Sequence, residues 1–138
     1  MIDYSKFELS LKRLEEQHMN LLGLGAEQPT LICQAVSESV IQRFETCYDC
    51  LWKVLKRYLA EELGIAEPPN SPRPLFRLAN ENGLFNSSLQ KWFEYASARI
   101  STSHDYDGEK ALTCLQLMPN FIDDAISLYQ RLTTETWR

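Results

Sequence analysis

The sequence predicts an all-α protein, an antiparallel up-and-down four-helix bundle with one additional short helix. Apolar residues recur at steps of three and four along most of the chain, which is the spacing of one helix face. No stretch alternates apolar and polar residues as a half-buried strand does. Glycine and proline residues divide the chain into helix-length segments. At 138 residues, we expect one domain that spans residues 1–138.

The first helix is predicted over residues 4–21, where apolar residues form an unbroken seam. Ser5 and Glu8 match a capping box at its start, and Gly23 is expected to end it. His18 occupies a seam position. A histidine buried against a neighbouring helix is therefore a simpler interpretation than a catalytic one.

The second helix is predicted to be much longer, from residue 29 to residue 64. At 1.5 Å per residue this is ~50 Å, a length typical of the spine of a bundle. Phe44, Tyr48 and Trp52 follow one another within it at steps of four. We interpret them as core residues and keep a base-stacking platform as the alternative.

Three shorter segments follow the spine. Residues 67–74 hold four prolines and are expected to break the helix, after which a short helix ends at Gly83. Ser87 and Gln90 match a second capping box, and the last helix is expected after Gly108. The inward residues are predicted to be Leu75, Leu78, Ala79, Leu89, Trp92, Phe93, Ala96, Leu112, Leu115, Ile122, Ala125, Leu128 and Leu132, with Ile100 as a further candidate and a kink at Pro119.

The chain shows no export or membrane signal. Its longest run without a formal charge covers residues 111–122, well short of the roughly 20 apolar residues of a spanning helix. A cytoplasmic location is therefore expected, with the four cysteines as reduced thiols. Cys47 and Cys50 form a C-x-x-C without a second ligand pair at metal-binding spacing, so no metal or other cofactor is expected.

The charge distribution restricts the possible partners. Fourteen basic against nineteen acidic residues give a net charge of −5, which argues against a protein that coats nucleic acid along a whole face. Residues 70–104 nevertheless carry four basic and two acidic side chains. This local excess permits contact with a single phosphate but not a long binding track.

A polar run between two apolar-striped helices, residues 98–108, is the best candidate for chemistry. It contains Arg99, His104 and Tyr106. If the preceding helix ends near Ser101, the returning chain can bring the imidazole back beside the guanidinium. The alternative is a polar turn whose serine, threonine and aspartate side chains cap helix ends, with Tyr106 an exposed aromatic residue.

The R-x4-H-x-Y pattern of this run, within an all-helical chain, resembles the HEPN family. More narrowly, the chain is similar to nucleotidyltransferase substrate-binding proteins, also described as HepT-like toxins. The other segments that carry the resemblance are Arg43-Phe44-Glu45, Trp52-Lys53 and Ser71-Pro72-Arg73. The resemblance implies the toxin of a toxin–antitoxin pair, a metal-independent endoribonuclease with its site at a homodimer interface. It also implies a partner, a minimal nucleotidyltransferase that neutralises the toxin by AMPylation.

The resemblance further implies that Arg99 and His104 are the catalytic pair and that Tyr106 accepts AMP. RNA is the expected substrate, and neither DNA nor a membrane is an expected partner. The chain departs from the family at Ile100, where an asparagine is common. Two other interpretations stay open: a non-catalytic substrate-binding subunit of a two-component nucleotidyltransferase, and a helical scaffold without a site.

Overall fold

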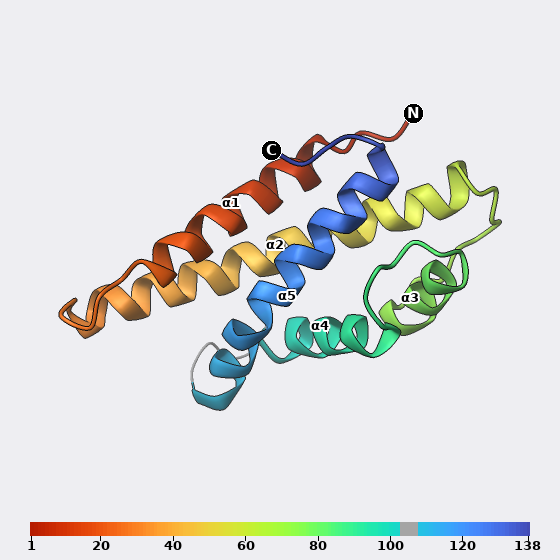
Figure 1. Ribbon diagram of the computed structural model, residues 1–138. Helices are drawn as coiled ribbons and strands as arrows, with labels where there is room; N and C mark the ends of the chain where they lie inside the picture. The colour runs from red at the N-terminus through yellow and green to blue at the C-terminus, as the bar shows by residue number, and fades with distance from the viewer. Residues whose placement is uncertain (103–107) are drawn as a thin grey trace.

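The computed structural model describes residues 1–102 and 108–138, and these residues form helices without any strand (Figure 1). The all-α prediction is confirmed, and the extra short helix is the third. No helix in the described residues is long and apolar enough to cross a membrane. The helices are α1 (Ser5–Leu22), α2 (Thr30–Glu61), α3 (Pro72–Glu81), α4 (Leu89–Thr102) and α5 (Gly108–Thr133).

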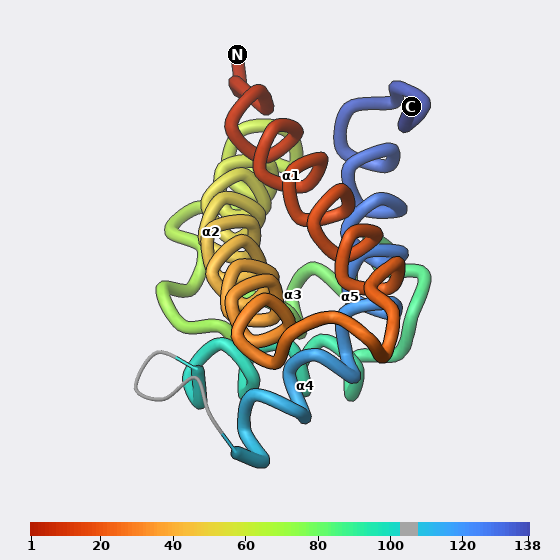
Figure 2. Tube along the Cα trace, turned by 90° about the vertical axis from the view of Figure 1, so that its left-hand side faces the viewer, coloured from red at the N-terminus to blue at the C-terminus, as the bar shows by residue number. Residues whose placement is uncertain are grey.

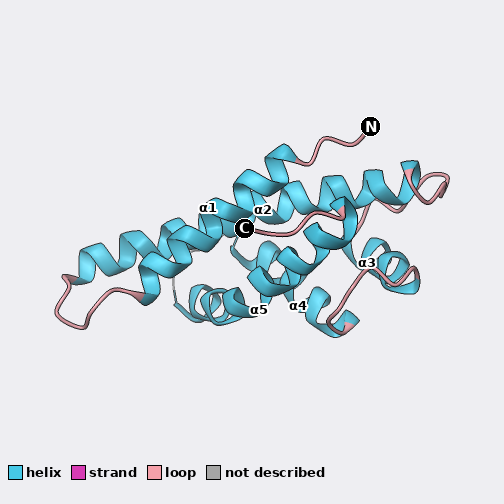
Figure 3. Ribbon diagram, turned by 45° about the horizontal axis from the view of Figure 1, so that its top comes forward, coloured by secondary structure: helices cyan, strands magenta, loops and turns pink. Residues whose placement is uncertain are grey.

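The long helices α1, α2 and α5 contact one another, and α2 also contacts α3 and α4. Figure 1 shows α1 and α2 running in opposite directions, with the C-terminal segment turned back beside α1. The shorter α4 contacts α2 and α5, and α3 contacts α2 and α4 (Figures 2 and 3). This arrangement brings the C-terminal half of α4 beside the middle of α2.

A closed ring of six aromatic side chains lies in the core. Neighbouring ring centroids are between 4.9 and 6.2 Å apart, which is within the range of favourable aromatic pairs. The ring joins four helices because its members come from α2, α3, α4 and α5. In order they are Phe44, Tyr48, Phe76, Trp92, Tyr95 and Phe121.

Burial confirms the predicted roles of several residues. Phe44 and Tyr48 are core residues, and Trp52 is half-buried at the edge of the core. His18 is buried in the α1 seam, and loss of solvent lowers its pKa. A neutral histidine that fills the seam explains its position without a catalytic role.

The structure corrects both capping boxes by one or two positions. The Asp3 carboxylate accepts the backbone N–H of Ser5 at 2.9 Å, so Ser5 is capped by a residue outside the predicted box. At α4 the Lys91 N–H lies 3.4 Å from Ser88 Oγ, which makes Ser88 the N-cap residue in place of Ser87. The Ser87 hydroxyl instead donates to the Asp124 carboxylate of α5, as described below.

Three further expectations were wrong in detail. The proline cluster does not exclude helix throughout, because α3 begins at Pro72, where a missing N–H costs nothing. On α3 the sequence pattern missed Phe76, which is fully buried, whereas the predicted Leu78 is partly buried and packs against the core. Leu112 of α5 and Ile100 of α4 have the correct spacing for the seams of their helices but are 56% and 63% exposed.

A buried carboxylate joins α4 to α5. Asp124 of α5 is 9% exposed and accepts hydrogen bonds from the Ser87 hydroxyl and the Tyr95 hydroxyl. Burial, together with this carboxylate, raises the pKa of Tyr95. The Asp124 carboxylate thereby fixes the start of α4 and one member of the aromatic ring.

We expect Asp124→Ala to lower the free energy of unfolding by about 2–3 kcal/mol, because two hydroxyl donors lose their acceptor in a buried setting. Urea denaturation followed by circular dichroism measures this. The matched control is Asp123→Ala, since the neighbouring Asp123 is exposed and its loss should cost at most about 0.5 kcal/mol. Equal effects of the two substitutions would contradict the structural role of Asp124.

Candidate functional site

Arg99 lies in the last turn of α4 and extends toward α2. The Asp49 carboxylate accepts two hydrogen bonds from it, one from Nε and one from Nη2, each 3.1 Å long. The remaining terminal nitrogen, Nη1, lies 3.4 Å from Glu45 Oε2. The guanidinium is thus held in a fixed orientation by two carboxylates from one neighbouring helix.

Glu45 and Asp49 are four residues apart on α2, so one helical turn places both on the face toward α4. Their surroundings differ. The Glu45 side chain is 12% exposed, whereas the Asp49 side chain is 51% exposed. The buried Thr102 hydroxyl lies 3.0 Å from both Glu45 Oε2 and the Ala98 carbonyl oxygen, so it can donate to either acceptor.

The two carboxylates outnumber the single guanidinium, so these three side chains carry a net charge of −1. With its side chain 26% exposed, Arg99 can be reached from solvent at the end of α4. An orienting network around a partly exposed guanidinium is an arrangement that can bind and stabilise a phosphate. We define Arg99, Glu45, Asp49 and Thr102 as the arginine site.

His104 and Tyr106 lie within residues 103–107, outside the described part of the chain. Their placement beside Arg99 stays a prediction. α4 is described to Thr102 and α5 from Gly108, so the predicted helix break between them also lies outside the described residues. Gly108 has a φ of 63°, a backbone conformation that favours glycine.

Sequence reasoning missed the acidic half of the arginine site. Glu45 stands in the Arg43-Phe44-Glu45 segment, which carried the family resemblance without a role for the glutamate. Asp49 follows it at helical spacing, which was the available signal. Arg43 itself points away from the site, and its Nη1 donates to the Arg13 carbonyl oxygen of α1 at 2.9 Å.

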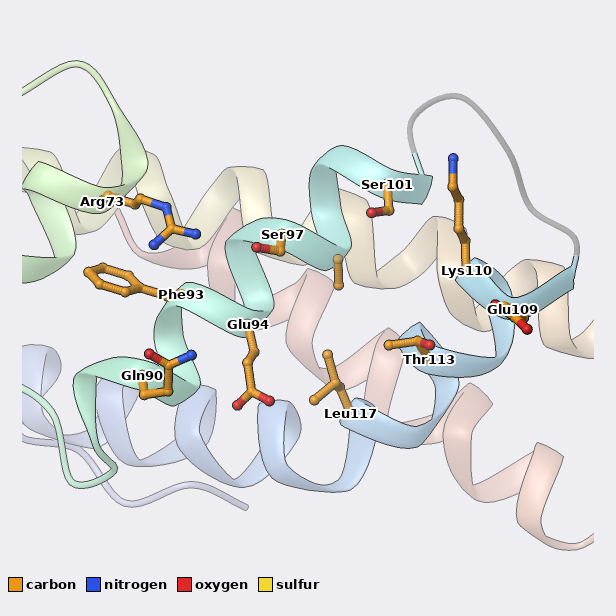
Figure 4. A pocket seen from close by; sticks show the side chains of 11 residues that line it. Arg73, Gln90, Phe93, Glu94, Ser97, Ser101, Glu109, Lys110, Thr113 and Leu117 are labelled. Carbon is orange, nitrogen blue, oxygen red and sulfur yellow. The ribbon is translucent and has the colours of Figure 1, made fainter.

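A hollow of about 350 Å³ lies on a different side of α4, lined by side chains from α3, α4 and α5 (Figure 4). Ser97 and Ser101 of α4 line it, and Arg73 sits 4.6 Å from the centre of the Phe93 ring at one end. Arg99 is about 200° around the helix from Ser97 and from Ser101. It therefore faces away from this hollow.

The cysteines offer no metal site within the described residues, where no group of metal-ligating side chains occurs. Cys47 is fully buried, and this burial raises the pKa of its thiol, which disfavours the reactive thiolate. Cys50 is partly exposed and unbridged. Both agree with the interpretation of the C-x-x-C pair as helix-packing side chains.

The chain matches known proteins over nearly its whole length. A family model described as "Nucleotidyltransferase substrate binding protein like" matches residues 2–134. A Haemophilus influenzae (strain Rd) protein named "Probable ribonuclease HepT" is 28% identical over 107 residues, which are 76% of this chain and 73% of that protein.

Solved structures share the fold. A crystal structure from Thermus thermophilus is 27% identical, with a TM-score of 0.76 over 92% of this chain and 98% of that one. A Haemophilus influenzae structure, described as the fold of a substrate binding domain of a nucleotidyltransferase, is 24% identical with a TM-score of 0.85. It covers 94% of this chain and 98% of that one, and at this identity the likeness concerns the fold alone.

Proposed function

The chain belongs to the nucleotidyltransferase substrate binding protein-like family, the HepT-like HEPN proteins, and we propose that it is a toxin with metal-independent endoribonuclease activity. The observation that carries the proposal is the orientation of Arg99 by Glu45 and Asp49 at the end of α4. This end leads directly into the segment with His104 and Tyr106. A relative that is named as a ribonuclease supports the same reaction class.

The proposed reaction needs a base and an anion-stabilising group. His104 removes the proton from a ribose 2′-hydroxyl, and the 2′-oxygen attacks the adjacent phosphorus. The bond to the 5′-oxygen breaks and this oxygen takes a proton from water, which leaves a 2′,3′-cyclic phosphate and a 5′-hydroxyl. Arg99 donates hydrogen bonds to the non-bridging oxygens as negative charge grows on them.

Purified protein is expected to cleave single-stranded RNA in the presence of EDTA. Arg99→Ala and His104→Ala should each lower the rate at least about 100-fold, the size of effect typical for loss of an acid–base or anion-stabilising group. Denaturing gels follow cleavage, and Arg131→Ala, an exposed arginine of α5, is the matched control. Activity that requires added metal, or that survives both substitutions, would overturn the mechanism.

We further propose that two chains form a homodimer, which supplies two Arg99–His104 pairs to one cleft. The exposed apolar side chains Ile100 and Leu112 support this, because they stand on either side of the candidate segment at 63% and 56% exposure. Burial of both residues against a second copy would place the two sites next to each other.

Sedimentation velocity at micromolar concentration should show a dimer. The double variant Ile100→Glu, Leu112→Glu should be monomeric and inactive, because two charges would enter the apolar contact. Leu31→Glu is the matched control, since Leu31 is 77% exposed near the start of α2. A monomeric wild-type chain with full nuclease activity would contradict the composite site.

The proposed partner is a minimal nucleotidyltransferase that transfers AMP to Tyr106. The family description and the fold shared with a nucleotidyltransferase substrate-binding domain support such a partner. The modification would add a negative charge two residues from His104. Two unit charges about 6 Å apart at an effective dielectric constant near 20 repel by roughly 3 kcal/mol, some hundredfold in phosphate binding.

Incubation with the partner, ATP and Mg²⁺ should add one or more AMP units to Tyr106 and abolish RNA cleavage. Tyr106→Phe should block the mass increase, whereas the half-buried Tyr58→Phe should not. Intact-mass spectrometry and peptide mapping measure both. Inhibition without modification would assign neutralisation to occlusion by the partner and overturn the AMP-transfer step.

The second candidate is a non-catalytic subunit that presents a substrate to the nucleotidyltransferase. Ile100 favours it, because an apolar side chain replaces a possible amide donor directly beside Arg99. This function would show as AMP transfer to the chain, or to a ligand that it binds, with no RNA cleavage by the purified protein.

A further inference from the structure

We propose that the two carboxylates of the arginine site have opposite effects on the reaction. Glu45 is a positioning residue that keeps Arg99 oriented, whereas Asp49 occupies the edge of the guanidinium that an RNA phosphate must use. Asp49 therefore restrains substrate binding until a phosphate displaces it. The inference rests on the proposed ribonuclease function and assigns the regulation of that same site.

Asp49 has the geometry of a competitor for phosphate. Its two oxygens accept from Nε and Nη2 of Arg99 at 3.1 Å each, which is the two-pronged geometry with which a guanidinium binds a phosphate. A phosphate that takes this edge has to replace the carboxylate. Because the Asp49 side chain is 51% exposed, it can turn into water at little cost in solvation.

Burial and hydrogen bonds hold the Glu45 side chain in place. Its side chain is only 12% exposed, and Oε2 is shared by Arg99 Nη1 at 3.4 Å and the Thr102 hydroxyl at 3.0 Å. Thr102 is itself 1% exposed. Rotation of Glu45 away from Arg99 would break these contacts inside the helix interface, so this carboxylate keeps the guanidinium oriented after Asp49 has left.

The charges of the arginine site explain why Asp49 weakens the binding of a phosphate. With both carboxylates in place these three side chains sum to −1, so the two carboxylates oppose an incoming phosphate. After displacement of Asp49 the guanidinium and Glu45 sum to zero and the phosphate supplies the second anion. Removal of the Asp49 charge should therefore strengthen RNA binding, whereas removal of the Glu45 charge should impair the orientation needed in the transition state.

The binding test uses the full-length His104→Ala chain, which leaves RNA intact, and a fluorescein-labelled single-stranded RNA 12-mer. Fluorescence anisotropy should show Asp49→Asn binding about five- to tenfold more tightly than the His104→Ala parent in low salt, with a smaller gain in high salt. Glu62→Gln is the matched control, because it removes one exposed carboxylate next to the far end of the same helix. It should change affinity by at most about twofold.

The kinetic test uses chains that retain His104. Glu45→Gln keeps the shape of the side chain and an acceptor for Thr102, and should lower kcat at least about tenfold with a smaller change in KM. Asp49→Asn should lower KM. The thermal unfolding temperature of each variant is also measured, because a variant that loses kcat but keeps this temperature has lost activity and not its fold.

The outcomes separate this inference from the proposed function. If the wild-type chain cleaves RNA but Asp49→Asn gains no more affinity than Glu62→Gln, the restraint is overturned and the ribonuclease stands. If Asp49→Asn loses kcat as strongly as Glu45→Gln, the division of roles is overturned. A wild-type chain that neither binds nor cleaves RNA overturns the proposed function and this inference together.

Discussion

The closed aromatic ring in the core is the contact on which the arginine site depends. Phe44 and Tyr48 of α2 and Tyr95 of α4 belong to this ring. Each stands at a short, fixed spacing from a site residue: Glu45 follows Phe44, Asp49 follows Tyr48, and Arg99 lies one helical turn after Tyr95. When the ring sets the register of α4 against α2, it also brings the guanidinium to the two carboxylates.

The free energies of these contacts indicate that core packing positions the arginine site, and not the reverse. Complete burial of a large aromatic side chain contributes about 2–3 kcal/mol, and an aromatic pair adds roughly 1 kcal/mol. An ion pair with a half-exposed partner, such as that of Arg99 with Asp49, is worth about 1 kcal/mol or less. The fold therefore positions the site, and the site contributes little to the fold. Substitutions at Arg99 or Asp49 should be informative about function because the helices do not need them.

Local sequence signals predicted the helices well and the arginine site only in part. The 3.6-residue period with glycine and proline boundaries located the helices, and the same period ended near Ser101, one residue before the end of α4. Glu45 and Asp49 were missed because they are 54 and 50 residues from Arg99. Their meeting depends on the register between two helices, which no local pattern contains. The capping boxes failed for a different reason, since other polar residues close by in the sequence, Asp3 and Ser88, accept backbone N–H groups at the starts of these helices.

Charge and position together restrict how the proposed enzyme can hold RNA. The exposed arginines of α3, Arg73 and Arg77, stand over the Phe93 ring, and the hollow beside Arg73 faces away from Arg99. Among the described residues of the arginine site the carboxylates outnumber the guanidinium, which weakens the positive field that draws long polyanions. Attraction there is short-ranged and begins only when a phosphate reaches the guanidinium. Such a site suits the recognition of one phosphodiester in an accessible strand, and a second copy of the chain would be the means of adding further contacts.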